Sequence, residues 1–299
     1  MRQIPRRMRV AAAKLMTDRA LAKLAPIPVP STGSPEVRLF LGHAGVRGAL
    51  ASAYSFLRYR AFPLIVHEDG TLTGEDWRRI VTLFPGAQLV EARQARSKTM
   101  AHLERWGLVR LAEFRLMHPL APKLLDLQLF AGGGRPTLYW DTDVLAHQEP
   151  TALLAAIERG QWTFNADVDT QYALQLPAPL PGVNAGLISF RLGHAEDSDG
   201  PSIEELWPVF EAALAMPRIE GQEWYIEQTL WAVAMGLSEG RPLPPEYDVC
   251  ARHARNGLDV VTQHYCSHQR QFLEERFLAD VLGHRGYPVR PIARHVGAW

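Results

Sequence analysis

The sequence predicts an α/β domain with a mixed, mostly parallel sheet that helices cover on both faces. From Val37 onward, short apolar runs alternate with amphipathic stretches of helical length. Such an alternation is typical of parallel sheets built from βα units. The chain has 299 residues, which is enough for one large domain of this class with a sizeable core.

The balance of charges and the few cysteines limit the classes of function and location. Lys plus Arg and Asp plus Glu number 32 each, so no overall positive field favours nucleic acid as a partner. The two cysteines, Cys250 and Cys266, are too few for a disulfide framework, and we expect free thiols. No apolar run approaches the roughly 18 residues of a spanning helix, and the N-terminus lacks the apolar core of a signal peptide. We therefore expect a soluble, cytoplasmic protein.

Residues 1–25 form a basic segment that stands apart from the rest of the chain. Its apolar residues recur at helical spacing: Ile4, Met8, Ala11 and Leu15. This basic amphipathic helix could lie peripherally on the inner face of an anionic membrane, or it could dock on its own domain. Closely spaced prolines then form a stiff linker. We therefore expect residues 1–36 to be helix and linker, and residues 37–299 to form the main domain.

The expected elements follow in chain order. Strands are expected at 37–41, 62–67, 87–90, 136–140, 162–164, 183–190 and 259–262. Helices are expected at 49–58, 73–84, within 98–131, at 151–159, at 203–216 and from 224 onward. In a largely parallel sheet, ligands bind beyond the carboxyl ends of the strands. Polar residues at those ends are therefore the candidates for function.

The run 136–140 ends in the sequence Asp141-Thr142-Asp143. Successive strand residues point to opposite faces, so Asp141 and Asp143 are expected to project to the same side. Two carboxylates on one side repel each other unless a cation lies between them, and Mg²⁺ or Mn²⁺ suits carboxylate oxygens. The alternative is a polar turn in which both aspartates are solvated.

Further polar features occur along the chain, and most of them have a structural alternative. They are Lys123, Asn184 with Gly186, Glu227 with Gln228, and His264. The lysine could be a helix-surface cation, the asparagine and glycine could mark a bulge, and the glutamate and glutamine could belong to a polar helix stripe. His264 follows the expected late strand.

In this order, the features resemble the GT-A glycosyltransferases, most nearly the family 8 type of nucleotide-diphospho-sugar transferases, over roughly residues 37–270. The resemblance implies a single GT-A (Rossmann-like) domain. It also implies metal-dependent transfer of a sugar from a nucleotide-diphosphate donor, expected to be a UDP-sugar, to a saccharide, lipid or protein acceptor. By the same resemblance, Asp141, Asp143 and His264 hold Mn²⁺ or Mg²⁺.

The resemblance also assigns residues to the donor. Implied donor-binding residues are Lys123, Asp141, Thr142, Asn184, Ala185, Gly186 and Arg270. One departure from the family pattern is Ser267, which stands before Arg270 where the family usually carries a glycine.

Glu227 and Gln228 match the catalytic pair of the family, with Glu227 in place of the usual aspartate. The resemblance implies that transfer retains the configuration at the anomeric carbon. An inverting reaction would need a general base instead, and Glu227, Asp167 or Asp169 could serve.

Two other functions are compatible with parts of the pattern. A phosphatase of the haloacid-dehalogenase type would use Asp141 as a covalent nucleophile, although that motif normally lies near the start of its domain. A non-catalytic scaffold that binds sugar nucleotides is the second alternative.

Overall fold

The computed structural model describes residues 6–132, 134–167, 169–176, 179–193, 200–249 and 260–283. The strands are β1 Glu36–Leu41, β2 Leu64–Glu68, β3 Gln88–Val90, β4 Thr137–Trp140, β5 Val144–Ala146, β6 Thr163–Ala166, β7 Val183–Phe190, β8 Arg241–Pro242, β9 Tyr247–Val249 and β10 Thr262–His264. The helices are α1 Arg6–Leu21, α2 Val46–Leu57, α3 Gly74–Leu83, α4 Ala92–Arg105, α5 Val109–Met117, α6 Ala121–Phe130, α7 Thr151–Glu158, α8 Ile203–Ala213, α9 Ile226–Leu237 and α10 Leu273–Arg276.

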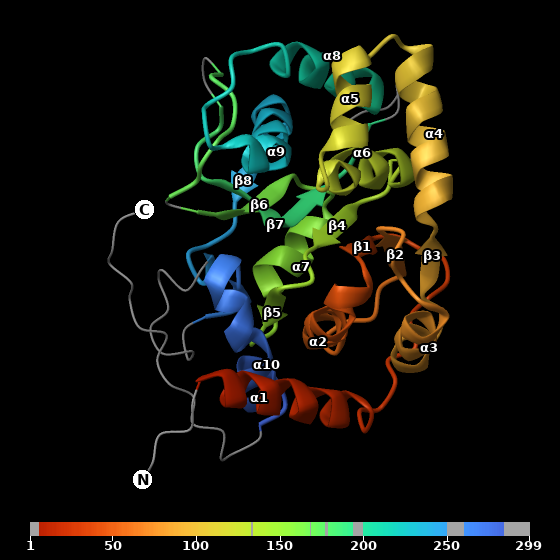
Figure 1. Ribbon diagram of the computed structural model, residues 1–299, viewed down its shortest axis with the longest axis vertical. Coiled ribbons are helices and arrows are strands. Elements are labelled where there is room, and N and C mark those ends of the chain that lie inside the picture. The colour runs from red at the N-terminus through yellow and green to blue at the C-terminus, as the bar shows by residue number, and fades with distance from the viewer. Residues whose placement is uncertain are drawn as a thin grey trace.

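A seven-stranded sheet in the order β3-β2-β1-β4-β7-β6-β8 lies at the centre of the molecule (Figure 1). Strands β3, β2, β1 and β4 are parallel, whereas β7 runs antiparallel to both β4 and β6. A second sheet, in the order β5-β10-β9, is attached beyond the end of β4. The expected mixed, mostly parallel sheet is confirmed.

Helices cover both faces of the large sheet, as expected (Figure 1). Helices α2, α3 and α7 share one buried apolar cluster with β1 and β4, and α4, α5, α6, α8 and α9 share another with the opposite sheet face. In β4, Leu138 and Trp140 point into the first cluster and Tyr139 into the second. This alternation is the two-residue period of a strand buried on both faces.

Most elements lie where the sequence predicts them, and local chemistry explains several boundaries. Thr73 and Asp76 form a capping box that starts α3. The region expected to be helical at 98–131 is divided into α4, α5 and α6, and Gly107, with φ of +67°, follows the end of α4. The short strands β5, β8 and β9 were not predicted, because strands of two or three residues carry too little periodicity.

The late strand was expected at 259–262 but occupies Thr262–His264, and Asp259 lies outside the described residues. The expectation of free thiols is wrong for Cys266, which is disulfide-bonded, and Cys250 lies outside the described residues. Two cysteines are too few for a framework, but they do not exclude a single disulfide bond.

Helix α1 packs against α2, against α10 and against the short helical segment Phe277–Val281 (Figure 1). Its buried side chains are Ala13, Thr17 and Leu21. Within the described part of the chain, no helix has the length and apolar character needed to cross a membrane.

Candidate functional site

The two aspartates lie in the tight turn between β4 and β5, at the carboxyl end of the parallel strands. Strand β4 ends at Trp140, and the Asp141 amide still donates to the Gly186 carbonyl on neighbouring β7, at 2.9 Å. Asp141 and Asp143 are 9% and 5% exposed. The alternative of a solvated turn is therefore wrong.

His264 reaches this turn because β10 pairs antiparallel with β5. The register places His264 opposite Val144, and the Tyr265 amide donates to the Asp143 carbonyl at 2.8 Å. Nε2 of His264 then lies 3.0 Å from Oδ1 of Asp143. One potential ligand atom from each of Asp141, Asp143 and His264 lies within 4.8 Å of the others, and all three residues are buried.

The chemistry of these three residues fits a divalent cation. Nδ1 of His264 lies 2.7 Å from the amide oxygen of Asn184, which can only accept, so Nδ1 carries the proton. The Nε2 lone pair of a neutral ring therefore faces Oδ1 of Asp143, and neither atom has a correctly oriented hydrogen-bond partner among the described residues. Two buried acceptors in contact need a cation or a proton between them.

A proton on His264 is the competing occupant of this position. Burial would lower the pKa of His264, but the neighbouring Asp143 carboxylate outweighs burial and raises it. Burial would likewise raise the pKa of Asp143, but His264 and Arg270 hold it below its ordinary value. Asp143 is thus held as a carboxylate, which is the form that ligates Mn²⁺ or Mg²⁺.

Asn184 and Gly186 together fix the position of the imidazole ring. The Asn184 amide oxygen accepts from His264 and also from the Gly186 amide, at 2.9 Å. A Cβ at Gly186 would lie 2.3 Å from Nδ1 of His264 and 2.4 Å from Cε1, so only glycine lets the ring lie against β7. The bulge alternative is also present, because the β6–β7 register shifts between Phe164 and Asn165 opposite this segment.

Lys123 and Arg270 each pair with one of the aspartates. The Lys123 ammonium on α6 donates to Oδ2 of Asp141 at 2.8 Å. Because the Lys123 side chain is only 9% exposed, the helix-surface alternative is wrong. Burial would lower its pKa, but the Asp141 charge outweighs this effect and raises it well above the ordinary value. Nε of Arg270 lies 2.5 Å from Oδ2 of Asp143, although Ser267 replaces the usual glycine.

Glu227 and Gln228 lie in the first turn of α9, and both are buried. The Trp231 indole donates to Glu227 at 2.9 Å. Burial raises the pKa of Glu227 to about 7, against the lowering effect of Lys123. Gln228 donates to the Gln171 carbonyl at 3.1 Å, and its Oε1 accepts from Asn184 at 3.5 Å. The pair therefore belongs to the polar surroundings of the three candidate ligands, and Gln228 contacts β7 directly.

The other residues considered from the sequence have less direct positions. The Thr142 amide donates to Asp141 Oδ1 at 2.8 Å, and Ala185 is buried on β7 between Asn184 and Gly186. Asp167 and Asp169 lie in the loop after β6, where the Asp169 amide donates to Asp167.

Sequence reasoning missed Ser52 on α2, which forms hydrogen bonds with the backbone of the turn that carries Asp141 and Asp143. Its hydroxyl lies 2.9 Å from the Asp141 carbonyl and 2.7 Å from that of Val144, and accepts from the Trp140 indole at 2.7 Å. Helix α2 can approach so closely because Gly48 faces the Thr142 carbonyl, 3.2 Å from where a Cβ would lie. The available signal was a serine within the alanine-rich sequence of a helix that was expected at 49–58.

No protein-family model matches the chain, and no curated protein matches it in sequence. Solved structures are similar to it. An active-site glutamine-to-glutamate mutant of LgtC matches with a TM-score of 0.55 and 14% identity, covering 83% of this chain and 96% of that one. The galactosyltransferase LgtC in complex with donor and acceptor sugar analogues matches with a TM-score of 0.52 and 12% identity over the same shares. The bifunctional glycosyltransferase WbbM matches with a TM-score of 0.51 and 14% identity, covering 86% of this chain and 51% of that one.

These similarities show the fold. The chain has the GT-A fold seen in these glycosyltransferase structures, as the resemblance in sequence implied. The Asp141-Asp143-His264 cluster lies at the carboxyl end of the parallel strands of this fold, where α/β sheets bind their ligands.

Proposed function

We propose that this protein is a metal-dependent glycosyltransferase of the family 8 type, which transfers a sugar from a nucleotide-diphosphate donor, expected to be a UDP-sugar. The observation that carries the proposal is the buried cluster of Asp141, Asp143 and His264 at the ligand-binding edge of a GT-A fold. Asp143 and His264 face each other without a properly oriented hydrogen bond, as two ligands of one ion would.

The residues around the cluster fit the demands of this reaction. When bound, Mn²⁺ or Mg²⁺ would act as a Lewis acid on the departing diphosphate. Lys123 and Arg270 place fixed positive charge at the same position, where negative charge grows during transfer. Arg270 is 66% exposed, so it can leave Asp143 and pair with a phosphate.

Glu227 and Gln228 would contact the transferred sugar together with Asn184. Gln228 and Asn184 already lie within 3.5 Å of each other and present amide groups that suit sugar hydroxyls. A pKa of about 7 lets Glu227 either accept or donate a proton near neutral pH. Retention at the anomeric carbon, as implied by the family resemblance, would make a general base at Asp167 or Asp169 unnecessary.

The test is hydrolysis or transfer of UDP-sugars with and without Mn²⁺, in the wild type and in Asp143→Asn. We expect activity that depends on Mn²⁺, and a loss of about 100-fold or more in the variant, because a charged ligand is removed. The same substitution at Asp18 on the outer helix α1 serves as the control. Equal, metal-independent activity in the wild type and Asp143→Asn would refute the proposal.

The same assay separates the alternatives. A haloacid-dehalogenase-type phosphatase would form a phospho-aspartate at Asp141, but both oxygens of Asp141 already accept hydrogen bonds from Lys123 and Thr142. A scaffold would bind nucleotide in the presence of Mn²⁺ but turn over no donor.

We further propose that α1 contacts an anionic membrane from the cytoplasmic side, so that the acceptor could be a saccharide, a lipid or a protein held there. Met8, Leu15 and Met16 are 62%, 53% and 39% exposed, although α1 is docked on its own domain. Exposed basic residues flank this apolar stripe: Lys14, Arg19 and Lys23. An apolar stripe with basic flanks fits an anionic lipid surface.

Co-sedimentation with vesicles tests this membrane contact. We expect binding to vesicles that contain phosphatidylglycerol, weaker binding to neutral phosphatidylcholine, and a loss of binding in Leu15→Glu. Leu237→Glu on α9 is the matched control, because Leu237 is also 53% exposed. Equal binding by the two variants would refute the contact, and cell fractionation would test the cytoplasmic location.

A further inference from the structure

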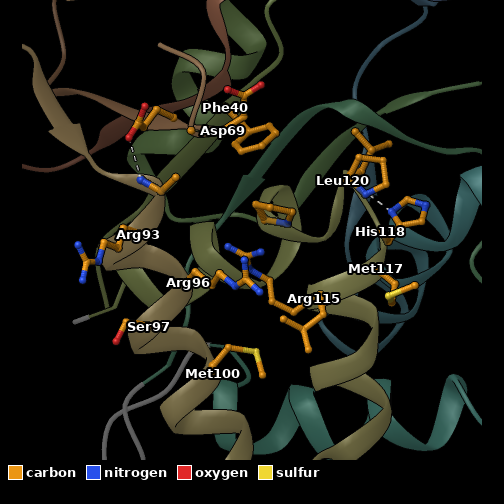
Figure 2. Close-up of a pocket in the computed structure, with 16 residues that line it drawn as sticks. Phe40, Asp69, Arg93, Arg96, Ser97, Met100, Arg115, Met117, His118 and Leu120 are labelled. Atoms are coloured by element: carbon orange, nitrogen blue, oxygen red, sulfur yellow. Dashed lines mark hydrogen bonds between the residues drawn. The ribbon is translucent and has the colours of Figure 1, made fainter. Parts of the chain in front are cut away.

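A cleft of about 980 Å³ opens at the carboxyl end of the parallel strands, on the side of α4 and α5. We call it the α4–α5 cleft. One end is formed by Phe40 near the end of β1 and by residues 68–70 at the end of β2. The two long walls are formed by α4 and by the segment 115–122 (Figure 2). Its volume is in the range of small-molecule sites.

The cleft lies beside the candidate metal site but does not include it. Arg38 on β1 pairs with Tyr139 on β4, and Phe40 and Asp141 each lie two residues further along these parallel strands. Phe40 and Asp141 therefore lie at the same edge of the sheet, at the carboxyl ends of neighbouring strands. On the opposite wall, Pro122 precedes Lys123, whose ammonium pairs with Asp141. A molecule in the cleft would therefore lie next to a sugar held at the metal.

Arg96 and Arg115 point into the cleft from α4 and α5 (Figure 2). Arg115 is buried, and its guanidinium donates twice to Asp126, at 2.8 and 2.7 Å. Arg96 is exposed to the cleft and has no hydrogen-bond or ion-pair partner among the described residues. The two acidic residues of the cleft hydrogen-bond locally instead: Glu68 accepts from the Ala92 amide, and Asp69 from Thr71. Arg96 is therefore available to an anionic group.

An aromatic surface continues the wall that carries His118. The ring centroids of His118 and Trp224 are 5.9 Å apart, and Trp224 is 58% exposed. Trp224 lies three residues before Glu227, so this surface leads from the cleft to the first turn of α9. An exposed indole offers an apolar face on which a sugar ring can pack.

We propose that the α4–α5 cleft binds the acceptor, and that this acceptor is a saccharide with an anionic group, phosphate or carboxylate, held by Arg96. The proposal rests on the proposed glycosyltransferase function. The Arg96 guanidinium, which points into the cleft, would bind the charged group, and the indole of Trp224 would pack against a sugar ring. The position beside Asp141 brings an acceptor hydroxyl to the donor sugar.

Binding of three simple sugars tests the inference: glucose, glucose 6-phosphate and glucuronate. Saturation-transfer NMR titrations are run with diamagnetic Mg²⁺ and uridine diphosphate present, so that the donor site does not take up the phosphate. We expect at least one charged sugar to bind about tenfold more tightly than glucose, because charge-assisted hydrogen bonds are the strong ones. Comparison of the two charged probes distinguishes a phosphate from a carboxylate.

Variants then assign the effect to residues. Arg96→Gln is expected to abolish the preference for the charged sugar and to leave the donor KM in hydrolysis unchanged. Arg105→Gln is the matched control, because Arg105 is an exposed arginine at the other end of α4, outside the cleft. Trp224→Ala is expected to weaken the binding of all three sugars by the same factor.

The inference would be overturned if glucose bound as tightly as both charged sugars, or if Arg96→Gln kept the preference for the charged sugar. A rise of the donor KM in Arg96→Gln would also overturn it, because the cleft would then hold the nucleotide. Failure of the glycosyltransferase proposal is a separate result, namely the absence of Mn²⁺-dependent donor hydrolysis and transfer in the wild type.

Discussion

Replacement of Gly186 by alanine tests how the third metal ligand is positioned. The new Cβ would lie 2.3 Å from Nδ1 of His264, 2.4 Å from Cε1 and 2.8 Å from Cγ. Ordinary contact begins at 3.4 Å, so the ring and the strand must separate by about 1 Å. Both are buried, and Asn184 holds the ring, so the required shift costs about 1–3 kcal/mol of stability.

The same shift moves the ligand atom of His264. A misplacement of about 1 Å at a catalytic group can lower the rate about 100-fold. We therefore expect Gly186→Ala to weaken Mn²⁺ binding, measured by electron paramagnetic resonance of free Mn²⁺, and to reduce donor turnover by about that factor. The melting temperature reports the cost in stability in the same preparation.

Gly236→Ala is the matched control, because a Cβ at this helical position on α9 meets nothing within 4 Å. It should be neutral or stabilise the protein by up to about 1 kcal/mol. If Gly186→Ala binds Mn²⁺ and turns over donor as well as Gly236→Ala, His264 is not positioned by its contact with β7 and our reasoning about the third ligand is wrong.

Three further predictions concern the support of the site and the buried polar groups. Asn184→Ala frees the imidazole of the third ligand and leaves the buried Gly186 amide without its acceptor. We expect Mn²⁺ affinity to fall about 10–100-fold and stability to fall by about 1–3 kcal/mol; unchanged affinity would contradict this. Ser52→Ala removes the hydroxyl that binds the aspartate turn, and urea unfolding should show a loss of about 1–3 kcal/mol, against no more than about 0.5 kcal/mol for the exposed Ser97→Ala. Burial and the charge of Arg38 hold the pKa of His67 well below 6.5. Below pH 6.5 the unfolded chain therefore binds a proton that the folded chain does not, and the free energy of unfolding decreases as the pH is lowered. The loss of stability by pH 5.5 is about 1 kcal/mol, and it should be absent in His67→Gln. Equal slopes of stability against pH in the wild type and in His67→Gln would refute this prediction.

Local sequence patterns were sufficient to predict the central strands and the position of the two aspartates. The apolar run at 136–140 is buried on both faces, and its two-residue period put Asp141 and Asp143 at its end. The alternation of strands and helices likewise predicted a sheet covered on both faces. These features follow from hydrophobic periodicity, which is a property of the local sequence.

The burial of Lys123 was decided by packing. In the sequence it is a lysine on a helix, and such lysines are mostly exposed. In the structure, α6 packs against β1 and α9, and Asp141 provides the opposite charge that makes the buried position tolerable. The sequence shows that Lys123 and Asp141 are present, but only the packed structure brings them within hydrogen-bonding distance.

The sequence by itself determined the fold class, the strand that ends in Asp141 and Asp143, and, through the order of motifs, the candidate set that includes His264. Only the tertiary structure decided that β10 pairs with β5, that the imidazole of His264 lies against Gly186, and that Ser52 holds the turn. Pairing between strands more than 100 residues apart depends on how the whole chain packs, because no local period records which distant edge a short strand will join.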